Sequence, residues 1–179
     1  QLVVYMNAAM ELESRKHPDK EIVPAALLYY HIDDPTIEAP VELTQEQINE
    51  EILAKLRMNG VVNSDPAVVE RLDRFMQDKS KVIPVEKKKD GSFSARSGVL
   101  SREEMQVVSS YVDAKIRDIG REILNGTIAA NPYEKGSEEA CTYCAYKKVC
   151  GFDCSIPGYE KRQLEELDKQ TLMQRMQET

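Results

Sequence analysis

The chain has 179 residues, which suits one ordinary domain. Apolar residues make up 41% of it, enough for a packed core, so wholesale disorder is excluded. Acidic residues outnumber basic ones by 31 to 24, and the charge of −7 argues against a free-standing DNA-binding domain, because such domains are usually basic. No apolar run approaches the roughly 20 residues of a membrane span, and no signal peptide opens the sequence, so we expect a cytoplasmic protein without a membrane partner.

The first 32 residues predict a helix followed by a strand. Residues 1–16 carry Leu2, Met6 and Ala9 at the i, i+4, i+7 spacing of one helix face. A continuous apolar run with two tyrosines then covers residues 25–32. Its length and composition are those of a buried strand.

A turn at residues 33–35 and two further helices are predicted next. The first helix starts with a capping box, formed by Thr44 and Gln47, and runs to Gly60. The second opens at the Asp-Pro pair of residues 65–66. Its inward side chains are predicted to be Val68, Val69, Leu72, Phe75 and Met76.

Residues 81–95 predict a β-hairpin around Asp90 and Gly91. The three lysines at 87–89 are interpreted as protection of a strand edge, and a nucleic-acid-binding patch is the alternative. A long helix follows, opened by a capping box of Ser101 and Glu104 and stopped at Gly126. Its apolar stripe predicts core packing and consists of Met105, Val108, Val112, Ile116, Ile119 and Ile123.

The order of these elements predicts a mixed α/β fold that is rich in helices and has few strands. Only three strands are predicted, whereas a central sheet usually has about five or six. We therefore expect a C-terminal piece of a larger domain whose other strands precede Gln1. Residues 1–160 would belong to that domain, and residues 161–179 would form a helical tail.

Four cysteines lie within fourteen residues, and the rest of the chain has none: Cys141, Cys144, Cys150 and Cys154. Because a cytosolic protein keeps its thiols reduced, such a cluster favours a metal over disulfides. Thiolates at this spacing suit zinc or an iron–sulfur cluster, although zinc sites more often use two close pairs. Zinc and four unligated thiols therefore stay open as alternatives to iron–sulfur.

The segment from Cys141 to Asp153 resembles the cysteine signature of the AddB family, which supplies one of the two subunits of bacterial AddAB helicase–nucleases. In that family three cysteines of this spacing join one far upstream and hold a [4Fe–4S] cluster. The resemblance implies that Cys141, Cys144 and Cys150 are cluster ligands and that the fourth ligand lies upstream of this chain. Cys154 lies outside the family pattern.

Gln1 and Tyr5 are four residues apart, so a helix places both side chains on one face. Taken with the cysteines, the pair resembles the QxxxY motif of RecB-like PD-(D/E)XK nucleases. In that family the motif follows the catalytic acidic and lysine strands and helps to position the active site and the DNA phosphate. The resemblance thus implies a catalytic positioning role for Gln1 and Tyr5. Glu86-x-Lys88 comes after the motif and is interpreted as hairpin decoration.

The resemblance implies the C-terminal part of a restriction-endonuclease-like nuclease domain. The full protein would be an ATP-dependent, Mg²⁺-dependent exonuclease subunit that resects double-strand DNA breaks. It would work with an AddA-like helicase–nuclease subunit on double- and single-stranded DNA. This chain alone would be inactive, because the acidic strands are missing. The alternatives are a non-enzymatic zinc-binding interaction module and a CRISPR-associated RecB-like nuclease.

Overall fold

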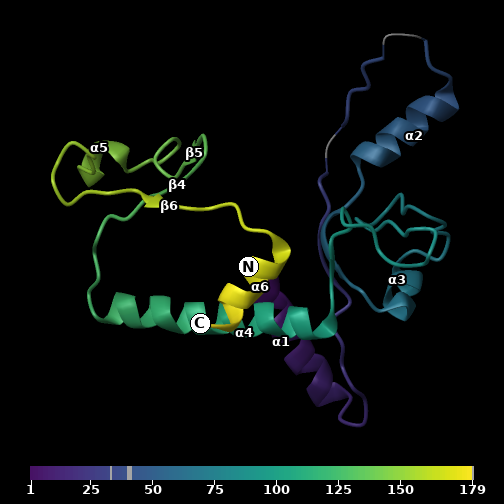
Figure 1. Cartoon of the computed structure of the whole chain (residues 1–179), viewed down its shortest axis with the longest axis horizontal. Coiled ribbons are helices and arrows are strands. Elements are labelled where there is room, and N and C mark those ends of the chain that lie inside the picture. The colour runs from purple at the N-terminus through teal and green to yellow at the C-terminus, as the bar shows by residue number, and fades with distance from the viewer. Residues whose placement is uncertain (33, 40–41, 179) are drawn as a thin grey trace. The chain divides into compact units, whose positions relative to one another are not determined.

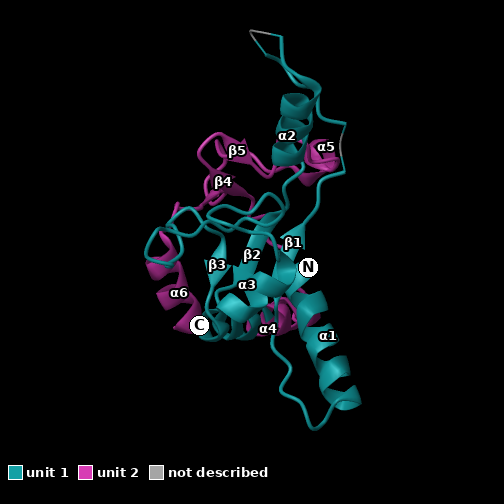
Figure 2. Ribbon diagram, turned by 90° about the vertical axis from the view of Figure 1, so that its right-hand side faces the viewer, with its two compact units in different colours: residues 1–112 teal, residues 113–179 magenta. Residues whose placement is uncertain are grey.

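Residues 1–32, 34–39 and 42–178 are described by the computed structural model of the chain (Figure 1). They divide into two compact units, residues 1–112 and residues 113–179 (Figure 2). The helices of the described residues are α1 (Leu2–Lys16), α2 (Gln45–Lys55), α3 (Pro66–Leu72), α4 (Arg102–Leu124), α5 (Lys147–Cys150) and α6 (Lys169–Gln177). The strands are β1 (Ala26–Tyr29), β2 (Asn59–Asn63), β3 (Val99–Leu100), β4 (Tyr133–Lys135), β5 (Glu138–Glu139) and β6 (Arg162–Gln163). The predicted mixed α/β class is confirmed.

The first unit contains a sheet of strand order β1-β2-β3. β2 lies between its neighbours, antiparallel to β1 and parallel to β3. Gly60 of β2 has a φ of 137°, and a Cβ at this position would lie 2.1 Å from the Leu27 carbonyl oxygen of β1. Only glycine allows this backbone conformation and this close strand approach.

The core of the first unit is formed by Val62 of β2, Val69 of α3, and Ile83 and Val85 of the following loop. All four are at most 1% exposed. Asn63 is equally buried, and its side chain donates to the Pro24 carbonyl at 2.9 Å and accepts from Asp65 N at 2.9 Å. These bonds satisfy the buried amide and connect β2 to the start of α3.

The helix predicted up to Gly60 ends earlier. The capping box of Thr44 and Gln47 is present, but α2 stops at Lys55, and residues 59–63 form strand β2, which was not predicted. The inward position predicted for Phe75 is also wrong, because this side chain is 94% exposed. α3 has ended by then, and the Asp73 carboxylate accepts a hydrogen bond from Phe75 N at 3.1 Å in the turn that follows.

The predicted strand at 25–32 shortens to the four residues of β1, which are half-buried except for the exposed Tyr29. Among the described residues, β1 is an edge strand paired only with β2, which explains its partial exposure. The turn predicted after it, at residues 33–35, includes a position outside the described residues.

The predicted hairpin at 81–95 keeps its turn but not its strands. Lys88 N donates to the Ser92 carbonyl at 2.7 Å across the turn, and a single bridge joins Lys87 to Phe93. Ile83 and Val85 are buried in the core, but no strand is assigned to the described residues around them. The segment is therefore a loop anchored by two apolar side chains.

The capping box predicted for α4 is confirmed by reciprocal bonds between Ser101 and Glu104 at 2.7 and 3.2 Å. Core packing holds for Met105, which is 1% exposed, but not for the far end of the stripe. Ile119 and Ile123 are 54% and 70% exposed. The apolar periodicity correctly indicates an amphipathic helix, but it does not indicate which turns of the helix have a packing partner.

The second unit contains a small sheet of strand order β5-β4-β6. β5 is antiparallel to β4, and β6 is parallel to it. The tail predicted to be helical from Lys161 instead begins with β6, and its helix, α6, starts only at Lys169. No helix in the described part of the chain is long and apolar enough to span a bilayer.

Candidate functional site

Gln1 and Tyr5 are in contact at the start of α1. The Gln1 Nε2 group donates a hydrogen bond to Tyr5 Oη at 2.8 Å. The backbone N–H of Tyr5 donates to the Gln1 carbonyl at 3.1 Å, so the first helical turn sets the spacing of the two side chains. Gln1 is exposed, and Tyr5 is 59% exposed. The two residues predicted to act together thus form one polar pair that faces solvent.

Tyr5 also borders a groove of about 400 Å³ between α1 and β1. The helix side of the groove includes Leu2, Met6 and Ala9, the residues predicted to share one face. None of them is fully buried. The polar Gln1–Tyr5 pair therefore lies beside a partly open apolar surface.

One contact joins α1 to α4, and a second joins α4 to the segment that follows α1. The Ser109 hydroxyl donates to Asn7 Oδ1 at 2.7 Å, in a partly buried position. Arg102, at the start of α4, pairs with Glu21 in the segment after α1. Each partner shifts the other's pKa, downward for the Glu21 carboxyl and upward for the Arg102 guanidinium, chiefly through their hydrogen bond. The helix that carries Gln1 and Tyr5 is thus hydrogen-bonded to α4 through Asn7, and the chain just after it is ion-paired with α4 through Glu21.

The four cysteines lie in and around the short helix α5, in the second unit: Cys141 and Cys144 precede it, Cys150 is its last residue, and Cys154 follows it. Cys144 N donates to the Cys141 carbonyl at 3.4 Å, and Cys150 N donates to the Tyr146 carbonyl at 2.8 Å. Cys141 is half-buried, and Cys144, Cys150 and Cys154 are exposed. The fold therefore leaves three of the four thiols open to solvent on one short segment, residues 141–154, which we call the cysteine segment.

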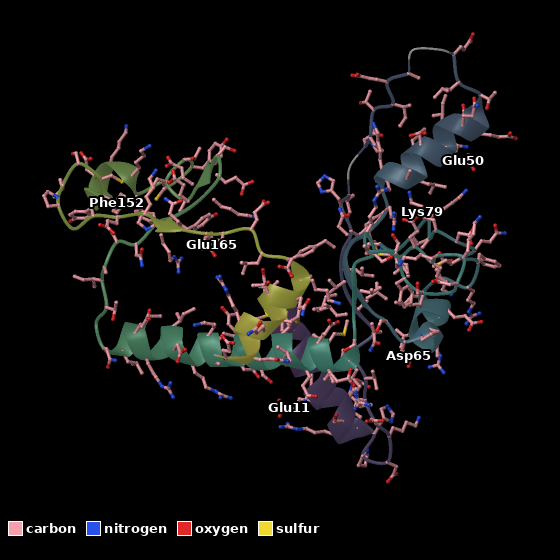
Figure 3. All side chains as sticks on the ribbon, viewed as in Figure 1. Glu11, Glu50, Asp65, Lys79, Phe152 and Glu165 are labelled. Atoms are coloured by element: carbon pink, nitrogen blue, oxygen red, sulfur yellow. The ribbon has the colours of Figure 1, made fainter. Side chains whose placement is uncertain are left out.

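Local turn chemistry shapes the end of the cysteine segment. Gly151 ends α5 with a φ of 69°, the left-handed conformation that follows many helices. The Asp153 carboxylate accepts from Ser155 N at 2.9 Å and from the Ser155 hydroxyl at 2.8 Å, which holds the pKa of Asp153 below its usual value. Phe152, which follows α5 (Figure 3), packs edge-on against Tyr159 with ring centroids 5.4 Å apart.

The donor set of the cysteine segment fits a thiophilic metal group in its chemistry. Three or four soft thiolates suit an iron–sulfur cluster or zinc. Within residues 1–32, 34–39 and 42–178, no group of three or more His, Cys, Asp or Glu side chains is arranged to hold a metal ion. The thiols are thus present and mostly accessible, on a short segment whose cysteine side chains must converge to bind a metal group.

Sequence reasoning missed the ionic contacts at the base of the cysteine segment. Lys161 Nζ lies 3.1 Å from Glu134 Oε1 and also pairs with Glu139, and Gln163 Nε2 donates to Glu134 Oε2 at 2.7 Å. The hairpin that carries Glu134 and Glu139 could have been predicted, because the Gly-Ser pair at 136–137 between two short polar runs is typical of a two-residue hairpin turn. The pairing of Lys161 with that hairpin carries no local signal.

The sequence model of the PD-(D/E)XK nuclease superfamily matches residues 1–151. The chain belongs to this superfamily. The match spans both the Gln1–Tyr5 pair and the first three cysteines. The nuclease relationship inferred from those two motifs is confirmed.

Relatives in three bacteria are named as subunits of an ATP-dependent helicase/deoxyribonuclease. The chain is 40% identical to the protein of Lachnoclostridium phytofermentans over 179 residues, covering 95% of the chain. It is 32% identical to the protein of Desulforamulus reducens, in a match that covers all of this chain. It is 39% identical to the protein of Clostridium acetobutylicum, in a match that covers 93% of this chain. The chain spans only 14–15% of the length of these relatives. Their names agree with the AddB resemblance.

Proposed function

We propose that the chain is the C-terminal part of the nuclease domain of an AddB-type subunit. The observation that carries the proposal is the similarity of nearly the whole chain to a small share of relatives named as helicase/deoxyribonuclease subunits. The complete protein would be an ATP-dependent exonuclease that resects double-strand breaks in the cytoplasm. Its partners would be an AddA-like subunit and double- and single-stranded DNA.

Gln1 and Tyr5 would position the DNA phosphate and the catalytic groups. Tyr5 Oη accepts its hydrogen bond from Gln1, so the tyrosine hydroxyl proton is left for an outside acceptor such as a phosphate oxygen. Mg²⁺, when held by carboxylates upstream of Gln1, would activate water and stabilise charge on the phosphate. In this proposal the present residues orient the substrate and supply no metal ligand.

Cys141, Cys144 and Cys150 would hold a [4Fe–4S] cluster together with one upstream thiolate. A ligand far upstream closes a long loop, and the cross-link that restricts a long loop removes the most entropy from the unfolded chain. Because binding energy at a structural metal site is folding energy, the cluster would stabilise the domain. Cys154 would not be a ligand.

The proposed activity is tested by degradation of linear duplex DNA by the complete subunit with its AddA-like partner, with and without Mg²⁺ and ATP. We expect degradation only with both, and none by purified residues 1–179 with Mg²⁺. Mg²⁺-dependent cleavage by residues 1–179 that survives both Gln1→Ala and Tyr5→Phe would contradict the proposed location of the active site.

A further inference from the structure

Lys161 joins three segments of the second unit through one ammonium group. Its Nζ pairs with Glu134 of β4, at 3.1 Å, and with Glu139 of β5. Lys161 itself directly precedes β6. Glu134 is shared, because its other oxygen accepts from Gln163 of β6 at 2.7 Å. The three strands are therefore connected by side chains as well as by their backbone.

These strands close the chain around the cysteine segment. β4 and β5 precede Cys141, and β6 follows Cys154. Arg162 N donates to the Pro132 carbonyl and Leu164 N to the Glu134 carbonyl, both at 2.9 Å. We call β4, β5, β6 and Lys161 the stem. All four cysteines lie on the loop that the stem closes.

The Lys161 contacts are better shielded from water than the other ion pairs among the described residues of this unit. The side chains of Lys161, Glu134 and Glu139 are 23%, 33% and 29% exposed. By contrast, Lys135 and Glu166 are 44% and 87% exposed and 3.5 Å apart. Exposed pairs contribute little, because water and salt screen them. Lys161 is thus the cation best placed to hold the stem closed, and Lys135, on the same strand as Glu134, is a matched control.

We propose that Lys161 is a positioning residue for the cysteine ligands. It keeps the stem closed before any metal binds. The four thiols are then already held on a closed loop when the metal arrives, and not on an open chain. The entropy of closing that loop is then lost during folding and not during metal binding. This inference rests on the cluster proposed above and adds the residue that prepares its site.

The test uses the complete subunit, purified without oxygen, as wild type and as Lys161→Met, Lys161→Arg and Lys135→Met. Iron and acid-labile sulfide are measured, followed by the rate of iron loss to a chelator. We expect Lys161→Met to lose iron about tenfold faster than wild type, the usual scale for groups that orient metal ligands. Lys161→Arg keeps the positive charge and should lose iron at a rate close to that of wild type. Lys135→Met should lose iron at the wild-type rate. Equal loss rates in Lys161→Met and wild type would overturn the proposal.

A second measurement does not depend on whether Lys161→Met folds. After iron is removed from the wild-type subunit, hydrogen exchange should still show protected amides at Arg162 and Leu164. Rapid exchange there would mean that the metal closes the loop, and would overturn the role of Lys161. Wild-type protein without iron would overturn the proposed cofactor, and the positioning role with it, even where these amides stay protected. The two failures are therefore distinguishable.

Discussion

Gln1 Nε2 donates a 2.8 Å hydrogen bond to Tyr5 Oη across one turn of α1. Both side chains are exposed, and an exposed pair of this kind contributes only about 0.2–0.5 kcal/mol to a helix. The bond therefore matters for the direction of the tyrosine hydroxyl more than for stability.

Removing either member of the Gln1–Tyr5 pair should affect cleavage and not folding. In the complete subunit, Gln1→Ala and Tyr5→Phe should each lower the nuclease rate by about tenfold to a hundredfold, the cost of misplacing a reacting group. The unfolding free energy should change by less than about 0.5 kcal/mol. Tyr30→Phe is the control, because Tyr30 is equally exposed at 58% and lies outside the pair. An equal loss of rate in the control would refute the role of the pair.

Residues 1–179 should bind duplex DNA poorly. The chain has a charge of −7, and non-specific binding depends on neutralising phosphates. Lys88 and Lys89 are exposed and Lys87 is half-buried, in a loop that also carries Asp90. We expect a Kd weaker than about 100 μM at physiological salt. Micromolar binding that disappears when all three lysines are changed to alanine would instead identify a DNA contact.

The stem should open in acid. The hydrogen bond from Gln163, and then the contacts with Lys161, hold the pKa of Glu134 below its usual value. A carboxyl whose pKa is lower in the folded state stabilises that state above its unfolded pKa, about 4.3, and the stabilisation disappears as the pH falls through the folded pKa. Exchange protection at Arg162 and Leu164, corrected for the intrinsic rate, should therefore decline below about pH 4.3. A decline of the same size in Glu134→Gln would show that another group is responsible.

Gly60 should be intolerant of a side chain. A Cβ there would lie 2.1 Å from the Leu27 carbonyl oxygen. This oxygen belongs to the backbone of the paired strand β1, so it cannot move aside as a flexible side chain could. We expect Gly60→Ala to lower the unfolding free energy by about 1–3 kcal/mol in chemical denaturation. Gly120→Ala is the control, since a Cβ there meets nothing within 4 Å, and this change inside α4 should stabilise by about 0.5–1 kcal/mol. A neutral Gly60→Ala would show that the strands can separate at this point.

Local chemistry in the sequence was enough to predict several elements of the fold. The side chains that start α2 and α4 also form the capping bonds, so Thr44 and Ser101 could be read directly from the sequence. The i, i+4 spacing of Gln1 and Tyr5 likewise predicted that their side chains share one helix face, and the structure adds the hydrogen bond between them.

The features that were missed depend on long-range partners. β2 is a strand because β1 and β3 pair with it, although Asn59 and Gly60 are poor strand formers. Ile83 and Val85 are buried because the loop folds back onto Val62 and Val69. Lys161 meets Glu134 across 27 residues, and no local pattern links them.

The central claim is tested most directly by the metal content of the complete subunit, purified without oxygen, as wild type and as four single cysteine variants. Wild type should contain iron and acid-labile sulfide in equal amounts, as a [4Fe–4S] cluster requires. The substitutions Cys141→Ala, Cys144→Ala and Cys150→Ala should each abolish the iron, and Cys154→Ala should retain it. Zinc in place of iron, or iron lost only in Cys154→Ala, would contradict the account.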